Sequence, residues 1–466
     1  MTIKIANGAG FLGDNLDAPR LLVKNARVDY LTLEYLAELT MSILARQRQK
    51  DSTAGYATDF LQVLQSLLPA LKTQPQLKII TNAGGVNPLA CAAAAGKILA
   101  AAGLGETAIG IVTGDDLLPR LQELQAAGCR FENLETNQPL SKLPHPVVCA
   151  NAYLGARPVA EALGGGARIV ITGRVADASL TVGPAMYEMK RNWNDWNFLA
   201  GASVAGHLIE CGAQVTGGLY CHWQNLDLAN VGYPIAEIHT DGSCTITKPT
   251  GTDGAVNRHT VIEQLVYEIG DPAHYLTPDV DVDFTTIDVE EIEPNQVAVR
   301  GATGRSAPEN YKVSLAYADG FTASGQLLAY GEDCVEKARA CGQIILQRVE
   351  RAGFKLQRTL IECLGAGDGV PGQKTGGRGQ GAGDSEPQPR EVVLRVSVRD
   401  SRREAVERFA KEIAPLITSG PPGLAGYATG RPQVRPVFAY WPTLVPKRFV
   451  QPTVFVQVAH QWRNAV

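Results

Sequence analysis

An arginine and an aspartate three positions apart, Arg174 and Asp177, are the residues with the most direct chemical potential, and both lie in one predicted loop. A guanidinium group can clamp a carboxylate or a phosphate, and a carboxylate beside it can act as a general base. The same spacing also suits an internal ion pair, with Asp177 or Ser179 capping the helix that follows. We favour the interpretation as a reaction centre, in which Arg174 anchors an acid and Asp177 moves a proton.

Other carboxylates follow predicted strands directly. Asp14 lies on a glycine loop, where a carboxylate can serve as a base or a metal ligand. The neighbouring Asp115 and Asp116 could hold Mg²⁺, which favours one or two carboxylates together with phosphate oxygens. Asp116 could instead cap the helix expected from Leu117, and this is the preferred interpretation of that residue. Asp14 and Asp115 therefore join Asp177 as candidate proton carriers, and Mg²⁺ stays an open candidate as a cofactor.

Amide, hydroxyl and imidazole side chains add further candidates. Asn82 and Asn151 could orient a carbonyl or hydroxyl group, although asparagines in turns more often bond to their own backbone. Tyr153 could protonate an enolate, or could pack with its hydroxyl hydrogen-bonded. His207 and Glu210 face the same side of one predicted helix, as acid–base partners would. Because no third ligand stands at a metal-binding spacing, we assign no metal site to this pair.

A strand, a two-glycine turn and an alanine-rich helix organise residues 78–104. Asn87 can cap the helix, and the proline after it suits the first helical turn. Gly84 and Gly85 permit positive φ and leave bare backbone in front of the helix. Because free N–H groups at a helix start favour anions, this stretch predicts a site for a phosphate or carboxylate. The residues assigned to ligand binding are Asn82, Gly84, Gly85, Asn87, Asn151 and Ser179.

Strands alternate with helices through residues 1–218, and each strand is an unbroken apolar run. This pattern predicts an α/β fold with a largely parallel sheet and flanking helices. Residues 219–364 contain strands separated by turns, which is typical of an antiparallel or mixed sheet in an α+β region. Residues 365–390 are rich in glycine and predict a flexible loop. Residues 391–466 predict a β-α-β-β unit, so the C-terminal portion is α+β.

Most of the candidate residues share one position in this scheme, because each follows a predicted strand of the parallel sheet. In such sheets ligands bind beyond the carboxyl ends of the strands. The sequence therefore predicts that these loops converge on one crevice. The residues placed there are Asn82, Asp115, Asp116, Asn151, Tyr153, Arg174, Asp177 and Ser179.

Residues 8–13 form a G-x-G-x-x-G sequence after a predicted strand over residues 2–7, as in a dinucleotide-binding motif. Asp14 and Asp17 follow where a pyrophosphate would lie, and their charges would repel it. An NAD-dependent oxidoreductase is therefore disfavoured, and a tight glycine turn is the preferred interpretation. The sequence contains neither a Walker pattern nor a G-x-S-x-G elbow, which disfavours P-loop and serine-hydrolase chemistry.

Composition limits the class of protein. A chain of 466 residues exceeds one ordinary core, so two or three domains are expected. A formal net charge of −4 gives no basic footprint for nucleic acid. No run approaches the roughly 18 apolar residues of a membrane span, and the N-terminus lacks the features of a signal peptide. The nine scattered cysteines fit reduced thiols. We expect a soluble cytoplasmic protein that forms a homo-oligomer and binds neither nucleic acid nor membrane.

Together these motifs resemble those of the acyclic terpene utilisation protein A family, over nearly the whole chain. Some relatives carry an additional ferredoxin-like domain, and this chain resembles the core unit without it. The matching segments are Gly8–Asp14, Asp29–Leu31, Glu34–Glu38, Thr81–Pro88, Gly173–Ser179, Thr216–Gly218, Gly420–Gly423, Arg431–Pro432 and Trp441–Pro446.

The resemblance implies a role beside enzymes that act on branched acyl-CoA thioesters during the breakdown of citronellol- and geraniol-type compounds. It assigns no catalytic residue. The leading hypothesis is an enzyme of branched-chain or isoprenoid acyl-CoA catabolism, namely a hydratase, lyase or thioester-processing enzyme that uses acid/base chemistry. The alternative is a non-catalytic subunit that binds acyl-CoA or a nucleotide within a catabolic complex. The residues assigned to catalysis are Asp177, Arg174, Asp14, Asp115, Tyr153, His207 and Glu210.

Overall fold

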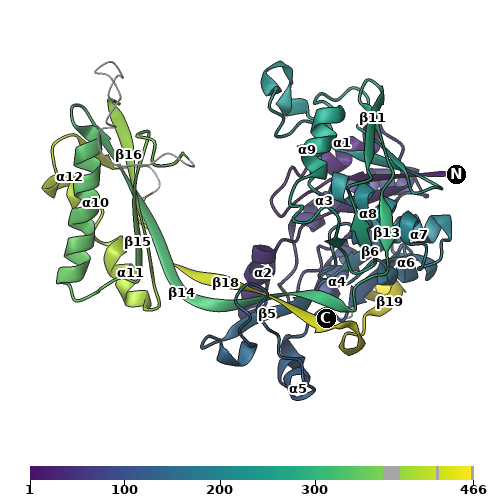
Figure 1. The fold of residues 1–466 in the computed structure, drawn as a ribbon, viewed down its shortest axis with the longest axis horizontal. Helices are drawn as coiled ribbons and strands as arrows, with labels where there is room; N and C mark the ends of the chain where they lie inside the picture. The colour runs from purple at the N-terminus through teal and green to yellow at the C-terminus, as the bar shows by residue number, and fades with distance from the viewer. Residues whose placement is uncertain (371–388, 427–429, 463–466) are drawn as a thin grey trace. The chain divides into compact units, whose positions relative to one another are not determined.

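The computed structural model describes residues 1–370, 389–426 and 430–462 (Figure 1). Most of the loop predicted over residues 365–390 lies outside these described residues. No helix in the described part of the chain is long and apolar enough to cross a membrane.

The chain divides into two compact units. Unit 1 comprises Met1–Ala316 together with Tyr440–Val466, and unit 2 comprises Tyr317–Ala439. The chain enters unit 2 along the strand β14 (Asn310–Tyr330) and leaves it along β18 (Arg435–Pro446). The strands of residues 219–316 therefore belong to the same unit as the N-terminal residues, and the last strand returns to it.

A ten-stranded sheet forms the centre of unit 1. Five neighbouring strands are parallel. In spatial order they are β1 (Thr2–Asn7), β2 (Tyr30–Leu33), β3 (Lys78–Thr81), β6 (Ile169–Thr172) and β4 (Ala108–Thr113). Antiparallel strands extend the sheet on both sides. They are β19 (Thr453–Val458) beside β4, and β7 (Ile235–His239), β8 (Cys244–Thr247), β12 (Gln296–Arg300) and β11 (Asp288–Glu293) beyond β1. The predicted α/β class with a mostly parallel N-terminal sheet is thus confirmed.

Helices cover the parallel strands on both faces, which explains why those strands are unbroken apolar runs. All four residues of β2 are buried, as are all four of β6. One face packs against α1 (Ala18–Asn25), α3 (Asp59–Thr73) and α4 (Pro88–Ala101). The helices α7 (Ser179–Met189) and α8 (Trp196–Glu210) contact β1, α7 also contacts β2, and α8 also contacts β7.

One predicted member of the parallel sheet lies elsewhere. Residues 147–152 form a strand, β5 (Val147–Ala152), but β5 pairs with β14 and is absent from the ten-stranded sheet. The prediction that this strand belongs to the parallel sheet is therefore wrong. An unbroken run of apolar residues indicates that both faces of a strand are buried. It does not identify the neighbouring strand, because strand pairing depends on residues distant in sequence.

The strand, turn and helix predicted around residues 78–104 are confirmed. The Asn87 side chain accepts a hydrogen bond from the Ala90 amide and caps α4. Gly85 has a φ of +53°, a conformation that favours glycine. A Cβ atom on Gly84 would lie 2.5 Å from the Thr172 carbonyl oxygen. Gly84 thus lets the loop after β3 pack directly against the end of β6, and this places the loop of Arg174 beside that of Asn82.

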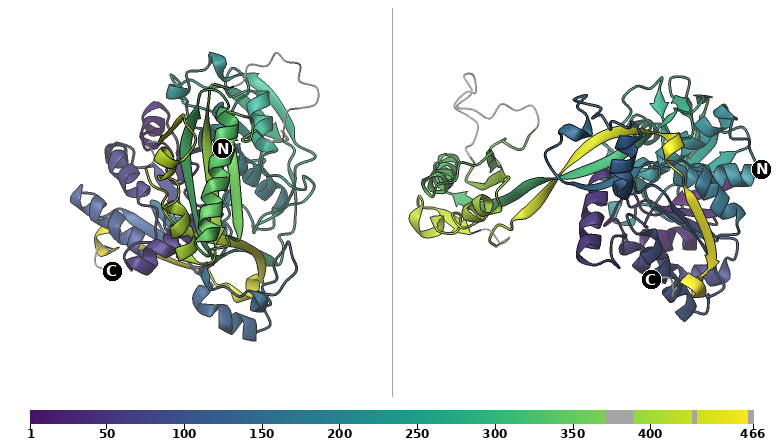
Figure 2. Two further views of the ribbon diagram at one scale, coloured as in Figure 1. Left: turned by 90° about the vertical axis from the view of Figure 1, so that its left-hand side faces the viewer. Right: turned by 90° about the horizontal axis from the view of Figure 1, so that it is seen from below.

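Unit 2 contains a second, antiparallel sheet, in which β15 (Arg358–Leu364), β16 (Glu391–Asp400), β14 and β17 (Leu424–Gly426) are neighbours. Buried residues alternate with more exposed ones along β16, as expected when one face alone is covered. The covering helices are α10 (Cys334–Arg351) and α11 (Arg403–Ala410), whose apolar residues share one core with the strands. Figure 2 shows α10 packed over one face of these strands.

Candidate functional site

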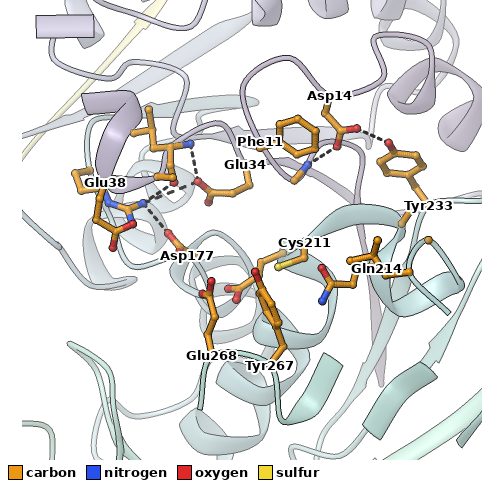
Figure 3. A pocket seen from close by; sticks show the side chains of 18 residues that line it. Phe11, Asp14, Glu34, Glu38, Asp177, Cys211, Gln214, Tyr233, Tyr267 and Glu268 are labelled. Atoms are coloured by element: carbon orange, nitrogen blue, oxygen red, sulfur yellow. Dashed lines mark hydrogen bonds and ion pairs between the residues drawn. The ribbon is translucent and has the colours of Figure 1, made fainter. Parts of the chain in front are cut away.

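A cavity of about 450 Å³ opens beyond the carboxyl ends of the parallel strands of unit 1 (Figure 3). The loops after β1, β2 and β6 line it, together with the end of α8 and the residues that follow α9 (Arg258–Leu265). A second hollow of about 400 Å³ shares four carboxyl residues with the first, so we treat the two as lobes of one cavity. The shared residues are Glu38, Asp177, Glu210 and Glu268.

Arg174 lies between two carboxyl groups at the wall of the first lobe. Its guanidinium Nη1 is 2.6 Å from Asp177 Oδ1 and 4.0 Å from Glu34 Oε1. It also donates to the Leu36 carbonyl oxygen at 3.1 Å. The Arg174 side chain is only 1% exposed, whereas that of Asp177 is 37% exposed. The predicted pair is therefore present, and Arg174 Nη1 is engaged by groups of the protein itself, whereas Arg174 Nε has no hydrogen-bond partner among the described residues.

Glu34 is a buried carboxyl group at the same wall. Its Oε1 accepts hydrogen bonds from the Leu36 amide at 2.9 Å and from the Asn82 side chain, while its Oε2 has no partner among the described residues. Burial, and then the charge of Asp177, raise the pKa of Glu34 well above its ordinary value, although Arg174 and the hydrogen bonds oppose this. The protonated form of Glu34 is thus favoured relative to that of an exposed glutamate.

Asn82 holds this carboxyl group in place. The Asn82 side chain donates to Glu34 Oε1, and its own Oδ1 accepts from the Tyr35 amide at 2.8 Å. Asn82 is fully buried and does not line either lobe. The structure therefore places Asn82 behind the cavity wall, where it fixes the loop after β2 rather than contacting a ligand.

Asp115 supports the loop of Arg174 in a similar way. Its Oδ2 accepts hydrogen bonds from the Arg174 amide at 2.9 Å and from the Asn151 side chain at 2.8 Å. A Cβ atom on Gly173 would lie 2.4 Å from Asp115 Oδ1, so glycine is needed for this close approach. Asp116 accepts from the Leu118 amide at 3.0 Å and stabilises a local turn, but the short 3-10 helix Leu118–Arg120 has Leu117 at its N-cap position, so Asp116 is not the predicted helix cap. No three His, Cys, Asp or Glu side chains in the described ranges are arranged to hold a metal ion.

The pKa of Asp115 predicts a pH dependence of stability. Burial raises this pKa from 3.8 to about 6, despite the opposing hydrogen bonds from Arg174 and Asn151. A carboxyl group whose pKa is raised on folding stabilises the fold fully below its unfolded pKa and loses that contribution as the pH rises through the folded pKa. The free energy of unfolding of the wild type, relative to Asp115→Asn, should therefore fall between about pH 4 and 7. Urea titrations across this range test it, and a constant difference would contradict it.

His207 and Glu210 form a hydrogen-bonded pair at the second lobe. His207 Nδ1 lies 3.1 Å from Glu210 Oε1, as the spacing on one helix predicts. The His207 ring packs against Tyr275 and Phe284, with ring centroids 5.7 and 5.8 Å away. Burial alone lowers the pKa of His207, but the hydrogen bond and charge of Glu210 raise it above its ordinary value. His207 Nε2 and Glu210 Oε2 are buried and have no hydrogen-bond partners within the described ranges.

Tyr153 borders the second lobe but is already engaged. Its hydroxyl donates to Glu38 Oε1 at 2.8 Å, and the Arg174 guanidinium lies 4.1 Å from its ring centroid. The Lys312 ammonium lies 4.8 Å from the same centroid. Burial raises the pKa of Tyr153 well above its ordinary value, against the effect of Arg174. Tyr153 therefore retains its proton and connects Arg174 with Glu38.

The glycine loop at residues 8–13 is held closed by Asp14, as Figure 3 shows. Asp14 Oδ2 accepts from the Gly10 amide at 2.8 Å, and its Oδ1 accepts from the Tyr233 hydroxyl at 2.6 Å. The Gly13 amide donates to Asp59 at 2.9 Å. Two of the amides that a pyrophosphate would use are thus bonded to carboxylates, which favours the interpretation as a glycine turn. Asp14 lines the first lobe but is itself fixed by these donors.

The helix start at Gly84, Gly85 and Asn87 does not line either lobe. The Gly85 amide donates to the Asn82 carbonyl at 3.1 Å, and the Asn87 amide donates to the Gly84 carbonyl at 2.8 Å. The loop is buried, so its amides serve the turn itself. Ser179 does not line either lobe, and its hydroxyl oxygen lies 3.5 Å from Asp279 Oδ2. The structure therefore separates these predicted ligand-binding residues from the cavity at Arg174.

Several residues of the cavity were not identified from the sequence. Glu34 directly follows β2, so the rule that selected the other strand ends would also have found it. Tyr267, Glu268 and Lys312 come from a helix end and from β14, outside the parallel strands, and no local pattern marks them.

Comparison with known protein families gives one match. The model described as "Acyclic terpene utilisation family protein AtuA" matches residues 3–456. No curated protein and no solved structure matches the chain. The matched range includes every residue that lines the two lobes.

Proposed function

The chain belongs to the acyclic terpene utilisation family, AtuA, and from this premise we propose that it is an enzyme of branched-chain or isoprenoid acyl-CoA catabolism. The proposed reaction is the addition or removal of water on the acyl chain of a thioester. Such a reaction needs a base that takes a proton from carbon and an acid that gives a proton to the departing hydroxyl group.

One observation carries this proposal: two carboxyl groups in different surroundings flank Arg174 on one cavity wall. Glu34 is buried, with a raised pKa and an unpartnered Oε2. Asp177 is partly exposed and accepts a hydrogen bond from Arg174. A buried carboxyl group beside a partly exposed one can supply an acid and a base in one site, because burial favours the protonated form of the first.

The roles follow from this geometry. Asp177 takes the proton from the carbon next to the thioester carbonyl. The electron pair of the broken carbon–hydrogen bond forms the new carbon–carbon double bond. The bond to the hydroxyl group breaks, and that group leaves as water with the proton of Glu34. Arg174 holds Asp177 in position and touches no reacting atom, so it is a positioning residue. In the hydration direction the same groups exchange roles.

Incubation of the purified protein with a panel of branched 3-hydroxyacyl-CoA and enoyl-CoA thioesters, followed by mass spectrometry, tests the proposal. We expect a product that differs from its substrate by one water molecule. Water labelled with ¹⁸O should introduce the label into the hydroxyl group in the hydration direction. Binding without conversion of any thioester would overturn the proposal and support the non-catalytic subunit instead.

A further inference from the structure

Carboxyl side chains dominate the wall of the first lobe. In the described part of the chain, Arg174 is the one lysine or arginine that lines this lobe, and it is already paired with Asp177. Six carboxyl groups line the same space, and they come from the loops after β1, β2 and β6, from α8 and from the residues after α9. These residues are Asp14, Glu34, Glu38, Asp177, Glu210 and Glu268.

The excess of negative charge persists when two of these groups are neutral. Burial raises the pKa of Glu34 and that of Glu210, which disfavours the charged form of each. Glu38 behaves oppositely: burial raises its pKa, but hydrogen bonds from its own backbone and from Tyr153 lower it more. Lys312 lies 3.5 Å from Glu38 and offsets one charge at the second lobe. Carboxylates therefore still outnumber cations around the space that a substrate would occupy.

Four buried polar atoms on residues that line the lobes have no hydrogen-bond partner among the described residues, namely Glu34 Oε2, Arg174 Nε, His207 Nε2 and Glu210 Oε2. Glu34 lines the first lobe and His207 lines the second, and neither Glu34 Oε2 nor His207 Nε2 has a partner among the described residues. The side chains of Glu34 and His207 are only 6% and 2% exposed. Buried polar atoms normally have a hydrogen-bond partner, so these two are suited to a hydroxyl or carbonyl group that enters the cavity.

We propose that the cavity selects acyl groups that carry no negative charge and rejects those that carry a free carboxylate. This inference rests on the proposed function and adds to it the charge class of the substrate. An anion inside the first lobe would lie among several carboxylates, while the one lysine or arginine that lines this lobe in the described part of the chain, Arg174, is already paired with Asp177, and such an excess of like charge away from bulk water is strongly disfavoured. The phosphates of a CoA thioester then stay outside both lobes, and the acyl end alone enters.

Two CoA thioesters of equal chain length test this selection, one ending in a methyl ester and one ending in a free carboxylate. We expect kcat/KM to favour the neutral thioester by about 10- to 100-fold, since contacts between like charges disfavour the thioester that carries the carboxylate. Glu268→Gln removes one charge from the wall shared by both lobes and should narrow the preference. The matched control is Glu290→Gln, an exposed residue of the sheet-edge strand β11, which should leave the preference unchanged.

Equilibrium binding of the same two thioesters separates this inference from the proposed reaction. Tighter binding of the neutral thioester, with a smaller difference between the two dissociation constants in Glu268→Gln, would support the charge selection even if neither compound were converted. Equal or tighter binding of the carboxylate-bearing thioester would overturn it, and so would a preference that Glu268→Gln and Glu290→Gln alter equally. Conversion of both thioesters at equal rates would also overturn the selection while supporting the proposed enzyme.

Discussion

Replacing Asp177 with asparagine should lower kcat by about 10²- to 10⁴-fold, the range that a general base typically contributes. The amide has nearly the same shape but cannot take a proton, so the base is removed while the cavity keeps its volume. In the wild type, Asp177 Oδ1 accepts a hydrogen bond from Arg174 Nη1 at 2.6 Å. The asparagine side chain still offers an oxygen atom for this bond. Because the Asp177 side chain is 37% exposed, the fold should survive the change. Steady-state turnover of the best thioester and a thermal melt of each protein provide the measurement.

Asp17→Asn is the matched control for this variant. Asp17 is an exposed residue that pairs with Arg20 and lines neither lobe, so this change should leave turnover unaltered. A folded Asp177→Asn protein with full turnover would remove Asp177 from the mechanism. A folded protein that loses kcat but retains its KM would show that the effect concerns the chemical step rather than binding.

The position of the site could be predicted from the sequence because parallel strands end at one edge of their sheet. Arg174 and Asp177 follow β6, and Glu34 follows β2, so a correct assignment of these strands already brings them together. His207 and Glu210 were placed by helical spacing alone, and their side chains do meet. Local periodicity is sufficient for inferences of this kind, since each depends on a few residues within one element.

The roles of individual side chains could not be predicted in the same way. Asn82 and Asp115 stand at strand ends as expected, yet each is buried and bonds to a neighbouring loop. Whether a polar group contacts a ligand or the protein depends on which loop packs beside it, and that is a property of the whole fold. The anion site expected at Gly84 and Gly85 illustrates this, because the amide of Gly85 is used within its own turn.

The pairing of strands could also not be predicted from the local sequence. β5 has the composition of a buried parallel strand, but its partner β14 begins more than 150 residues later. Glu268 and Lys312 reach the cavity from regions whose sequences indicate only helix ends and strands. The two-unit division has the same origin, because the last strand, β19, pairs with β4 across most of the chain.

Replacing Arg174 with methionine should destabilise unit 1 by about 1–3 kcal/mol, the cost of leaving a buried hydrogen-bond acceptor without its donor. The Arg174 side chain is only 1% exposed and interacts with Asp177, with the Leu36 carbonyl and with the ring of Tyr153. Methionine fills much of the space but leaves the carbonyl oxygen and the carboxyl groups without their cation. Urea unfolding followed by circular dichroism measures the change. Arg20→Met, at an exposed pair, is the control and should alter stability by about 1 kcal/mol or less.

Adding Glu34→Gln to Arg174→Met tests whether the two charges act on one another. Arg174 opposes the burial that raises the pKa of Glu34, so loss of the cation should drive Glu34 further toward its neutral form. Glutamine at position 34 carries no charge at any pH, and the double variant should therefore be destabilised by less than the sum of the two single changes. The difference between the summed losses of the single variants and the loss of the double variant should grow as the pH rises, because the ionised form of Glu34 is the form that Arg174 stabilises. Strictly additive losses at every pH would show that Arg174 stabilises the loop through its other contacts and that Glu34 and Arg174 are not energetically coupled.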